Sequence, residues 1–195
     1  MRLAALAALS IFMLGCTAAT TPAGAINSQT ATQARTGPEI SPPPVTPPTP
    51  PGDVTVAFAC KDMSGGKTGT TNVIAVRTGE QAGFDRFVIQ FDSQIPAYTI
   101  KRQSKATFTQ GASGQPITLV GSAGVLITLK STSQETYSGP TDITHPEYAI
   151  LKEARVVEAF EGTVQWGIGL ASPVCMRVFT LSDPVRLVID FSTNP

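Results

Sequence analysis

The chain has 195 residues, of which 42% are hydrophobic and 14% are charged, and its 14 Lys and Arg balance its 14 Asp and Glu. This length allows one modest domain plus additional segments. From residue 53 onward, 12 basic residues stand against 13 acidic ones. A near-neutral domain cannot neutralise many phosphates, so the composition argues against nucleic acid as a partner.

The N-terminus has the pattern of an export signal. Arg2 precedes an almost unbroken apolar run over residues 3–14, which is too short for a permanent membrane span. Cys16 follows a Leu-Gly pair, which resembles the lipobox of bacterial lipoproteins, where the cysteine is diacylated. We predict a signal peptide over residues 1–15 and a lipid on Cys16 that anchors the protein to the cell membrane. An ordinary cleaved signal peptide that contains a cysteine is the alternative.

Residues 16–52 are predicted to form a disordered tether. They are rich in Ala, Thr, Gln and Ser, and eight of the 16 prolines lie between Pro38 and Pro51. Such a composition cannot bury a core, and it favours polyproline II where the prolines cluster. At about 3.1 Å per residue the Pro-rich part would reach roughly 45 Å. We favour a spacer over a ligand for an aromatic groove.

Residues 53–195 are predicted to form one all-β domain, a β-sandwich of mainly antiparallel strands. Alternating apolar and polar residues predict short strands, and Gly-containing turns separate them at the spacing typical of a sandwich or barrel. Gly79 and Gly83 mark the turn of a predicted hairpin. The expected strands cover residues 54–60, 72–77, 84–91, 97–102, 116–120 and 124–130, with three more between 164 and 191.

Two segments of this domain lack a clear period. Residues 131–147 form a long polar excursion that contains the single histidine, His145. Residues 147–160 have the composition of a short helix. However, the all-β context and the Val156-Val157 pair favour a strand over residues 154–159.

Two of the expected strands repeat one another. Arg86-Phe-Val-Ile-Gln-Phe91 and Arg186-Leu-Val-Ile-Asp-Phe191 share an apolar face and an opposite face of the form Arg-x-Val-x-polar. Any two amphipathic strands of this composition would look alike. The alternative is a sandwich of two related sheets, each presenting such an Arg-x-Val-x-polar outer face.

Five motifs, taken in order and spacing, resemble the AMIN-like domain of exported and lipoprotein-type proteins, chiefly of actinobacteria, over roughly Val73 to Ser192. The resemblance implies an envelope-associated β domain, because the related AMIN domain accompanies bacterial N-acetylmuramoyl-L-alanine amidases and some secretion-system components. There it is a β-sandwich that targets its partner to the envelope by binding peptidoglycan. The motifs are Gly83–Phe91, Tyr137-Ser-Gly-Pro140, Phe160-Glu-Gly162, Trp166-Gly-Ile-Gly-Leu170 and Arg177–Asp190.

We therefore expect a non-enzymatic, lipid-anchored envelope protein that binds peptidoglycan or another envelope component. The candidate ligand-binding residues are Arg86, Gln90, Arg186 and Asp190, because a guanidinium binds carboxylates such as those of stem peptides in a forked geometry. The arginines could equally form structural ion pairs with Asp85, Asp183 or Asp190. An assembly protein that binds a partner through its sheet edges is the alternative function, and a hydrolase is the least favoured.

Catalytic and metal chemistry find little support in the sequence. His145 has no Ser or Cys motif nearby, and the several histidines typical of zinc hydrolases are absent. Acidic residues could approach one another in space, but no spacing singles out a pair among Glu158, Glu161, Asp183 and Asp190. We expect no catalytic residue, no metal site and no cofactor.

The remaining cysteines and the single tryptophan are assigned structural roles. With Cys16 lipidated, we favour a disulfide between Cys60 and Cys175 in an oxidising compartment, and two buried free thiols are the alternative. Trp166 is expected in the core. On the opposite side of its strand, Gly167 and Gly169 leave room for the close approach of a neighbouring strand or a glycan chain.

Overall fold

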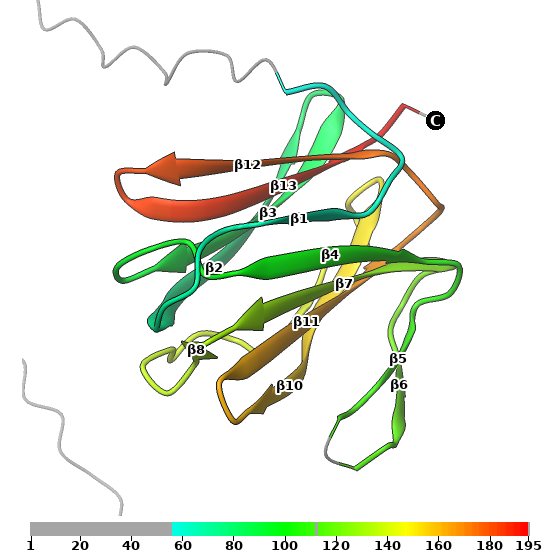
Figure 1. Cartoon of the computed structure of the whole chain (residues 1–195). Coiled ribbons are helices and arrows are strands. Elements are labelled where there is room, and N and C mark those ends of the chain that lie inside the picture. The colour runs from blue at the N-terminus through cyan, green and yellow to red at the C-terminus, as the bar shows by residue number, and fades with distance from the viewer. Residues whose placement is uncertain (1–55, 112, 195) are drawn as a thin grey trace, which may run out of the picture. The chain divides into compact units, whose positions relative to one another are not determined.

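The computed structural model describes residues 56–111 and 113–194, and all regular structure in this part of the chain is β-strand (Figure 1). The predicted signal peptide, the lipidation site Cys16 and the predicted linker at 16–52 lie outside the described residues. No helix in the described part is long and apolar enough to cross a membrane. The strands are β1 (Met63–Gly65), β2 (Thr71–Gln81), β3 (Phe84–Phe91), β4 (Tyr98–Gln103), β5 (Thr107–Thr109), β6 (Pro116–Thr118), β7 (Ala123–Lys130), β8 (Thr132–Ser133), β9 (Asp142–Thr144), β10 (Leu151–Phe160), β11 (Thr163–Leu170), β12 (Met176–Ser182) and β13 (Val185–Ser192).

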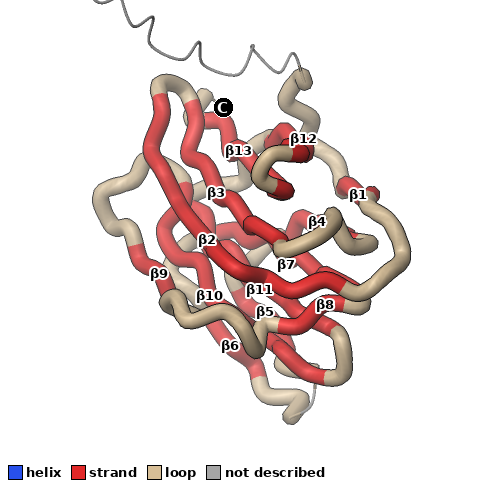
Figure 2. The backbone as a smooth tube through the Cα atoms, turned by 90° about the vertical axis from the view of Figure 1, so that its left-hand side faces the viewer, coloured by secondary structure: helices blue, strands red, loops and turns tan. Residues whose placement is uncertain are grey.

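Two sheets pack face to face, which confirms the predicted all-β sandwich (Figures 1 and 2). The six-stranded sheet has the order β1-β4-β7-β11-β10-β9, and the five-stranded sheet has the order β12-β13-β3-β2-β8. All strand pairs are antiparallel except the short parallel contact between β2 and β8. Strands β5 and β6 form a separate two-stranded hairpin.

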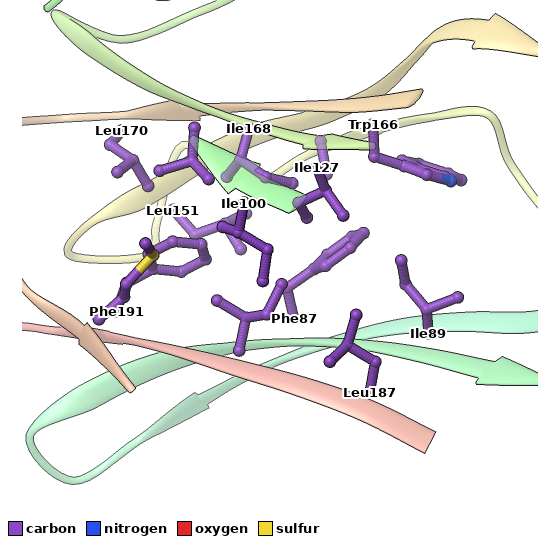
Figure 3. Packing of buried hydrophobic residues seen from close by; sticks show 14 of the residues in the cluster. Phe87, Ile89, Ile100, Ile127, Leu151, Trp166, Ile168, Leu170, Leu187 and Phe191 are labelled. Carbon is purple, nitrogen blue, oxygen red and sulfur yellow. The ribbon is translucent and has the colours of Figure 1, made fainter. Parts of the chain in front are cut away.

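The core fills the space between the two sheets (Figure 3). The long strands of both sheets contribute alternate side chains to it, because successive side chains of a strand point to opposite faces. Trp166 is fully buried, as predicted, and its ring centroid lies 5.6 Å from that of Phe87 on the opposite sheet. Burial of such a side chain contributes about 1.5–3 kcal/mol. Other fully buried members are Ile89, Ile100, Ile127, Leu151, Ile168, Leu170, Leu187 and Phe191.

The β5–β6 hairpin covers the outer face of the six-stranded sheet at β10 and β11. A second apolar cluster forms beneath it from Ala106, Phe108, Leu119 and Val157. Glycines on β11 make this contact possible. A Cβ on Gly167 would lie 2.9 Å from the Phe108 ring, and one on Gly169 would lie 2.1 Å from the Val120 carbonyl oxygen. The room left by these glycines is therefore occupied by the chain's own hairpin, and a glycan does not fill it.

A buried carboxylate helps to hold this hairpin in place. Glu153 on β10 is 4% exposed, and its Oε2 accepts a hydrogen bond of 2.7 Å from the Val120 amide. Arg155 compensates the charge, since its Nε lies 3.1 Å from Glu153 Oε1. The hairpin thus has a polar tether as well as an apolar underside.

The structure corrects several expected strand boundaries. The strand predicted at residues 54–60 does not form over residues 56–58. The next residue, Ala59, makes a single bridge with Met176. Strand β2 continues through Gly79 to Gln81, so the hairpin turn is shorter than predicted. The ambiguous segment at 147–160 contains strand β10, which confirms the favoured strand over the helix. Four short strands, β1, β5, β8 and β9, were not predicted.

The interpretation of the repeated strands as members of two different sheets is wrong. Strands β3 and β13 are hydrogen-bonded neighbours in the five-stranded sheet. Sequence periodicity defines which face of a strand is buried, but it does not define which strand lies beside it. Both copies of the Arg-x-Val-x-polar pattern therefore lie on one surface.

Candidate functional site

The antiparallel pairing of β3 and β13 places the two copies of the pattern head to tail. Arg86 lies opposite Asp190, and Gln90 lies opposite Arg186. The matching valines, Val88 and Val188, face one another between these pairs. Each arginine is therefore beside the polar residue of the other copy, on the face of the sheet that points away from the core.

Asp190 organises two arginines on this face. It is fully buried, and it accepts hydrogen bonds from Arg86 Nε (2.6 Å) and Nη2 (3.0 Å) and from Arg177 Nε (2.6 Å). Residue Arg177 comes from β12, where it lies directly opposite Asp190. The side chains of Arg86 and Arg177 remain 32% and 20% exposed. The group has two guanidinium ions and one carboxylate, so one positive charge is uncompensated.

Aromatic rings pack against these two guanidinium groups. The Arg177 guanidinium lies 4.6 Å from the Phe84 ring centroid and 4.9 Å from that of Phe58. The Arg86 guanidinium lies 5.0 Å from Phe84 and 5.5 Å from Phe179. Cation–π contacts of this kind contribute about 0.5–1 kcal/mol at exposed sites. They also limit the orientations of the arginine side chains.

Two further arginines on the same face have no ion pair among the described residues. Arg77 on β2 is exposed and donates a hydrogen bond of 2.8 Å to the Gln90 side-chain oxygen. Arg186 donates to the backbone carbonyls of Pro184 (3.2 Å) and Asp183 (3.3 Å). We name this surface the arginine face and define it by Arg77, Arg86, Gln90, Arg177, Arg186 and Asp190.

All four sequence-predicted ligand-binding residues lie on the arginine face, but their positions differ. Arg86, Gln90 and Arg186 are partly exposed, whereas Asp190 lies beneath two guanidinium groups. Of the possible ion pairs for the two arginines, only Arg86 with Asp190 forms. Asp85 points into the sandwich, where its Oδ2 accepts the amides of Ile150 (2.6 Å) and Leu151 (2.8 Å).

Sequence reasoning missed Arg77, Arg177 and the flanking phenylalanines. The usable signal for Arg177 and Phe179 was their alternation with Met176 and Val178 in a predicted strand. Arg77 stood at the end of a strand that was predicted too short. Phe58 belonged to the alternation that predicted a strand at residues 54–60, but no strand forms over residues 56–58, so this alternation did not place Phe58 on the arginine face.

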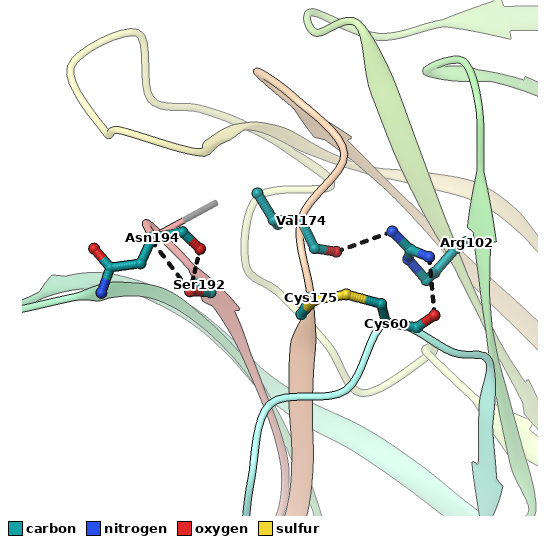
Figure 4. Close-up of a disulfide and its surroundings, with 6 residues drawn as sticks. All are labelled: Cys60, Arg102, Val174, Cys175, Ser192 and Asn194. Atoms are coloured by element: carbon teal, nitrogen blue, oxygen red, sulfur yellow. Dashed lines mark hydrogen bonds between the residues drawn. A yellow bond between two sulfur atoms is a disulfide. The ribbon is translucent and has the colours of Figure 1, made fainter.

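The disulfide between Cys60 and Cys175 confirms the predicted pairing (Figure 4). It joins the segment before β1 to the segment before β12, across a sequence separation of 115. Arg102 also connects the two segments through hydrogen bonds. Its Nη1 donates to the Cys60 carbonyl (3.1 Å) and its Nη2 donates to the Val174 carbonyl (3.3 Å). These contacts fix the start of the domain beside the edge strand β12.

His145 lies in a hydrogen-bonded series that sequence analysis did not foresee. Its Nε2 is 2.7 Å from the Thr78 hydroxyl, and its Nδ1 is 2.9 Å from Glu147 Oε1. The pKa of the exposed Glu147 carboxyl is lowered by its own backbone N–H and by His145. The Tyr148 ring stacks on the imidazole at 4.0 Å. We assign these contacts a structural role, in which they close the sandwich beside β2.

The described residues do not assemble a metal centre. They contain no group of three or more His, Cys, Asp or Glu placed to hold a metal ion. The acidic residues weighed for glycoside cleavage are divided between the two sheets. Glu158 and Glu161 lie on β10 and in the turn after it, whereas Asp183 and Asp190 lie in the β12–β13 turn and on β13.

Comparison with known proteins identifies the described domain. The family model of the AMIN-like domain matches residues 71–193, from the start of β2 to the residue after β13. The comparison with curated proteins found no match. The matched region contains every residue of the arginine face.

Proposed function

Since the chain belongs to the AMIN-like domain family, we propose that it is a lipid-anchored cell-envelope protein that binds peptidoglycan, without catalysis, through its arginine face. AMIN-like domains are associated with binding to peptidoglycan and the cell envelope, and they generally bind or target rather than catalyse. Their association with the envelope also indicates an extracytoplasmic location.

The observation that carries this proposal is the excess of guanidinium over carboxylate on one surface. Four arginines share the face with one carboxylate, in a domain whose charges as a whole nearly cancel. Guanidinium groups bind carboxylates in a forked geometry, and peptidoglycan stem peptides carry carboxylates. Because Asp190 and the phenylalanines hold Arg86 and Arg177 in place, binding at these side chains costs little conformational entropy.

The proposed anchor is consistent with the disulfide. A bridge between Cys60 and Cys175 is typical of an oxidising compartment outside the cytoplasm. A lipid on Cys16 would hold the chain at the membrane, and residues 16–52 would give the domain its reach toward the wall. Mass spectrometry of the exported protein tests this part directly. A diacylated Cys16 is expected, and an unmodified mature N-terminus elsewhere would contradict the anchor.

Cosedimentation with purified peptidoglycan tests the binding proposal. The protein would be the mature chain with Cys16→Ser, which keeps the linker and the domain but removes the lipidated thiol. The variant Arg77→Gln/Arg186→Gln removes the two arginines of this face that form no ion pair with any described residue, so the Asp190 group stays intact. The control Lys101→Gln/Lys130→Gln removes the same charge from two exposed residues of the six-stranded sheet.

We expect the unsubstituted chain and the lysine control to sediment with peptidoglycan. The arginine variant should bind at least about tenfold more weakly, which corresponds to 1.4 kcal/mol. Equal loss in both variants would indicate unspecific charge attraction and contradict the arginine face. A chain that stays in the supernatant but carries down a membrane protein would favour the assembly function. Release of reducing sugar from peptidoglycan would contradict the absence of catalysis.

A further inference from the structure

Strand β12 has an open edge. It is the outermost strand of the five-stranded sheet (Figure 1). Within residues 56–111 and 113–194, only Met176, the first residue of β12, is bridged on the outer side. Met176 exchanges two backbone hydrogen bonds with Ala59, of 2.8 and 3.1 Å. In an antiparallel strand, alternate residues direct both backbone groups to the same side. Val178, Thr180 and Ser182 therefore point their N–H and C=O groups outward, and none of these groups has a backbone partner among the described residues.

This edge lacks the usual protection against pairing. Natural edge strands carry charged residues, prolines or bulges that prevent the addition of another strand. Residues 178–182, Val-Phe-Thr-Leu-Ser, carry no charge and no proline. Valine, phenylalanine and threonine also favour extended backbone. The open part of β12 is thus suited to accept another strand.

We propose that β12 pairs antiparallel with β12 of a second copy of this chain, across a two-fold axis at Thr180. In this register Val178 lies opposite the partner's Ser182, and Thr180 lies opposite the partner's Thr180. All three open residues of each copy then find backbone partners. The two five-stranded sheets become one continuous sheet of ten strands.

Features at both ends of β12 limit the register of this pairing. An axis at Val178 would require the outer backbone groups of Met176, which Ala59 already occupies. An axis at Ser182 would place Thr180 opposite the partner's Pro184, which has no N–H to donate. An axis at Phe179 would likewise place Ser182 opposite the occupied Met176, and one at Leu181 would place Val178 opposite the partner's Pro184. The axis at Thr180 is the one that pairs all three open residues of each copy.

The same register makes the side chains on the arginine face self-complementary. Phe179 lies opposite the partner's Leu181, in a pair of apolar residues that occurs twice across the axis. Arg177 lies opposite the partner's Asp183. The carboxyl of Asp183 forms no ion pair within the described residues, whereas the Arg177 group has one positive charge to spare. The chemistry of the edge therefore fits a second copy of itself.

A groove beside the edge accommodates the inward side chains of the added strand. A cavity of about 590 Å³ lies between the end of β12 and the loops of the opposite sheet, and Ile95, Leu181 and Val185 contribute apolar surface to it. The partner's Val178, opposite Ser182, would project toward this groove. Residues 38–51 of the chain itself are poor candidates for the edge, because their eight prolines lack the required N–H groups.

Sedimentation equilibrium of the mature chain with Cys16→Ser tests the proposal, with Thr180→Pro as the decisive variant. The proline removes both hydrogen bonds of the central pair, but the Thr180 N–H does not contribute to the ladder with β13. We expect the unsubstituted chain to dimerise and the variant to raise the dimer Kd at least about tenfold. Thermal unfolding should be unchanged at concentrations at which both chains are monomeric. Phe179→Pro is the control, because its N–H points toward β13, and it should lower the unfolding temperature.

Three results would overturn the proposal. The first is an unsubstituted chain that remains monomeric at about 1 mM, and the second is a Thr180→Pro variant that still dimerises. The third concerns the register, which a single introduced cysteine reports. Thr180→Cys should form a disulfide-linked dimer on oxidation, because residues paired at the axis have Cα atoms about 5.5 Å apart. If Val178→Cys crosslinks and Thr180→Cys does not, the axis is misplaced and the proposal fails.

Discussion

Replacement of Asp190 by asparagine tests whether this residue organises the arginine face. The substitution keeps the shape of the side chain but removes the charge that Arg86 and Arg177 share. Asp190 is fully buried and accepts three hydrogen bonds from the two guanidinium groups. In the variant, two positive charges would face one another without a carboxylate between them.

The expected cost follows from these contacts. Removal of one partner from a buried ion pair costs about 3–5 kcal/mol. The two arginine side chains are 32% and 20% exposed, so they can regain part of their hydration. We therefore expect Asp190→Asn to lower the free energy of unfolding by about 3 kcal/mol, at the lower end of that range.

Urea denaturation of the mature chain with Cys16→Ser measures this loss, and Asp142→Asn is the matched control. Asp142 also pairs with an arginine, Arg155, but both side chains are more than a third exposed. Exposed ion pairs contribute about 0–1 kcal/mol to stability, so the Asp142→Asn control should lose little free energy of unfolding. If Asp190→Asn also lost less than about 1 kcal/mol, with an unchanged m-value, the organising role of the buried carboxylate would be refuted.

Three further predictions concern stability. Cys60→Ser with Cys175→Ser should lower the free energy of unfolding by about 5 kcal/mol, because the bridge closes a loop of 115 residues; a loss below about 2 kcal/mol in urea denaturation would contradict this entropic account. Gly167→Ala should cost about 1–3 kcal/mol and expose the β5–β6 hairpin to limited proteolysis, because its Cβ would lie 2.9 Å from the Phe108 ring. Gly79→Ala is the control, with its Cβ no closer than 3.6 Å to any atom, and an equal loss in both variants would count against hairpin packing. Hydrogen bonds from the backbone and side chain of Asn72 and from Thr71 hold the pKa of Asp92 well below its usual range. The stabilisation is present above the ordinary Asp pKa of about 3.9 and is lost as pH falls toward the lowered pKa, so Asp92→Asn should flatten the acid side of a stability profile.

The strands that the sequence predicted best are those with one buried face. Strand β3 alternates in burial without interruption, because every second side chain packs in the core, whereas β7, β11 and β13 alternate only in part and also contain consecutive buried residues. Strand β10 was ambiguous for a physical reason. Its pairing with β11 shifts register between Leu151 and Glu153 and again between Val156 and Glu158. Each irregularity breaks the alternation, so the residues imitate a helical pattern.

The composition of the arginine face could be predicted only in part. The repeated pattern identified Arg86, Gln90, Arg186 and Asp190 as residues of one type of surface. Their convergence depends on the pairing of β3 with β13, and strand neighbours are set by the whole chain rather than by local period. For the same reason, the burial of Asp190 beneath Arg177 could not be read from either strand alone.

The most direct measurement of peptidoglycan binding is an NMR titration of the mature chain with Cys16→Ser, using soluble peptidoglycan fragments that carry intact stem peptides. We predict chemical-shift changes at the Nε–H groups of Arg86 and Arg186 and along the amides of β2, β3, β12 and β13. The Arg77→Gln/Arg186→Gln variant should need a higher fragment concentration for the same response. Changes confined to the six-stranded sheet or to the β5–β6 hairpin, or no change at about 1 mM fragment, would contradict the assignment of binding to the arginine face.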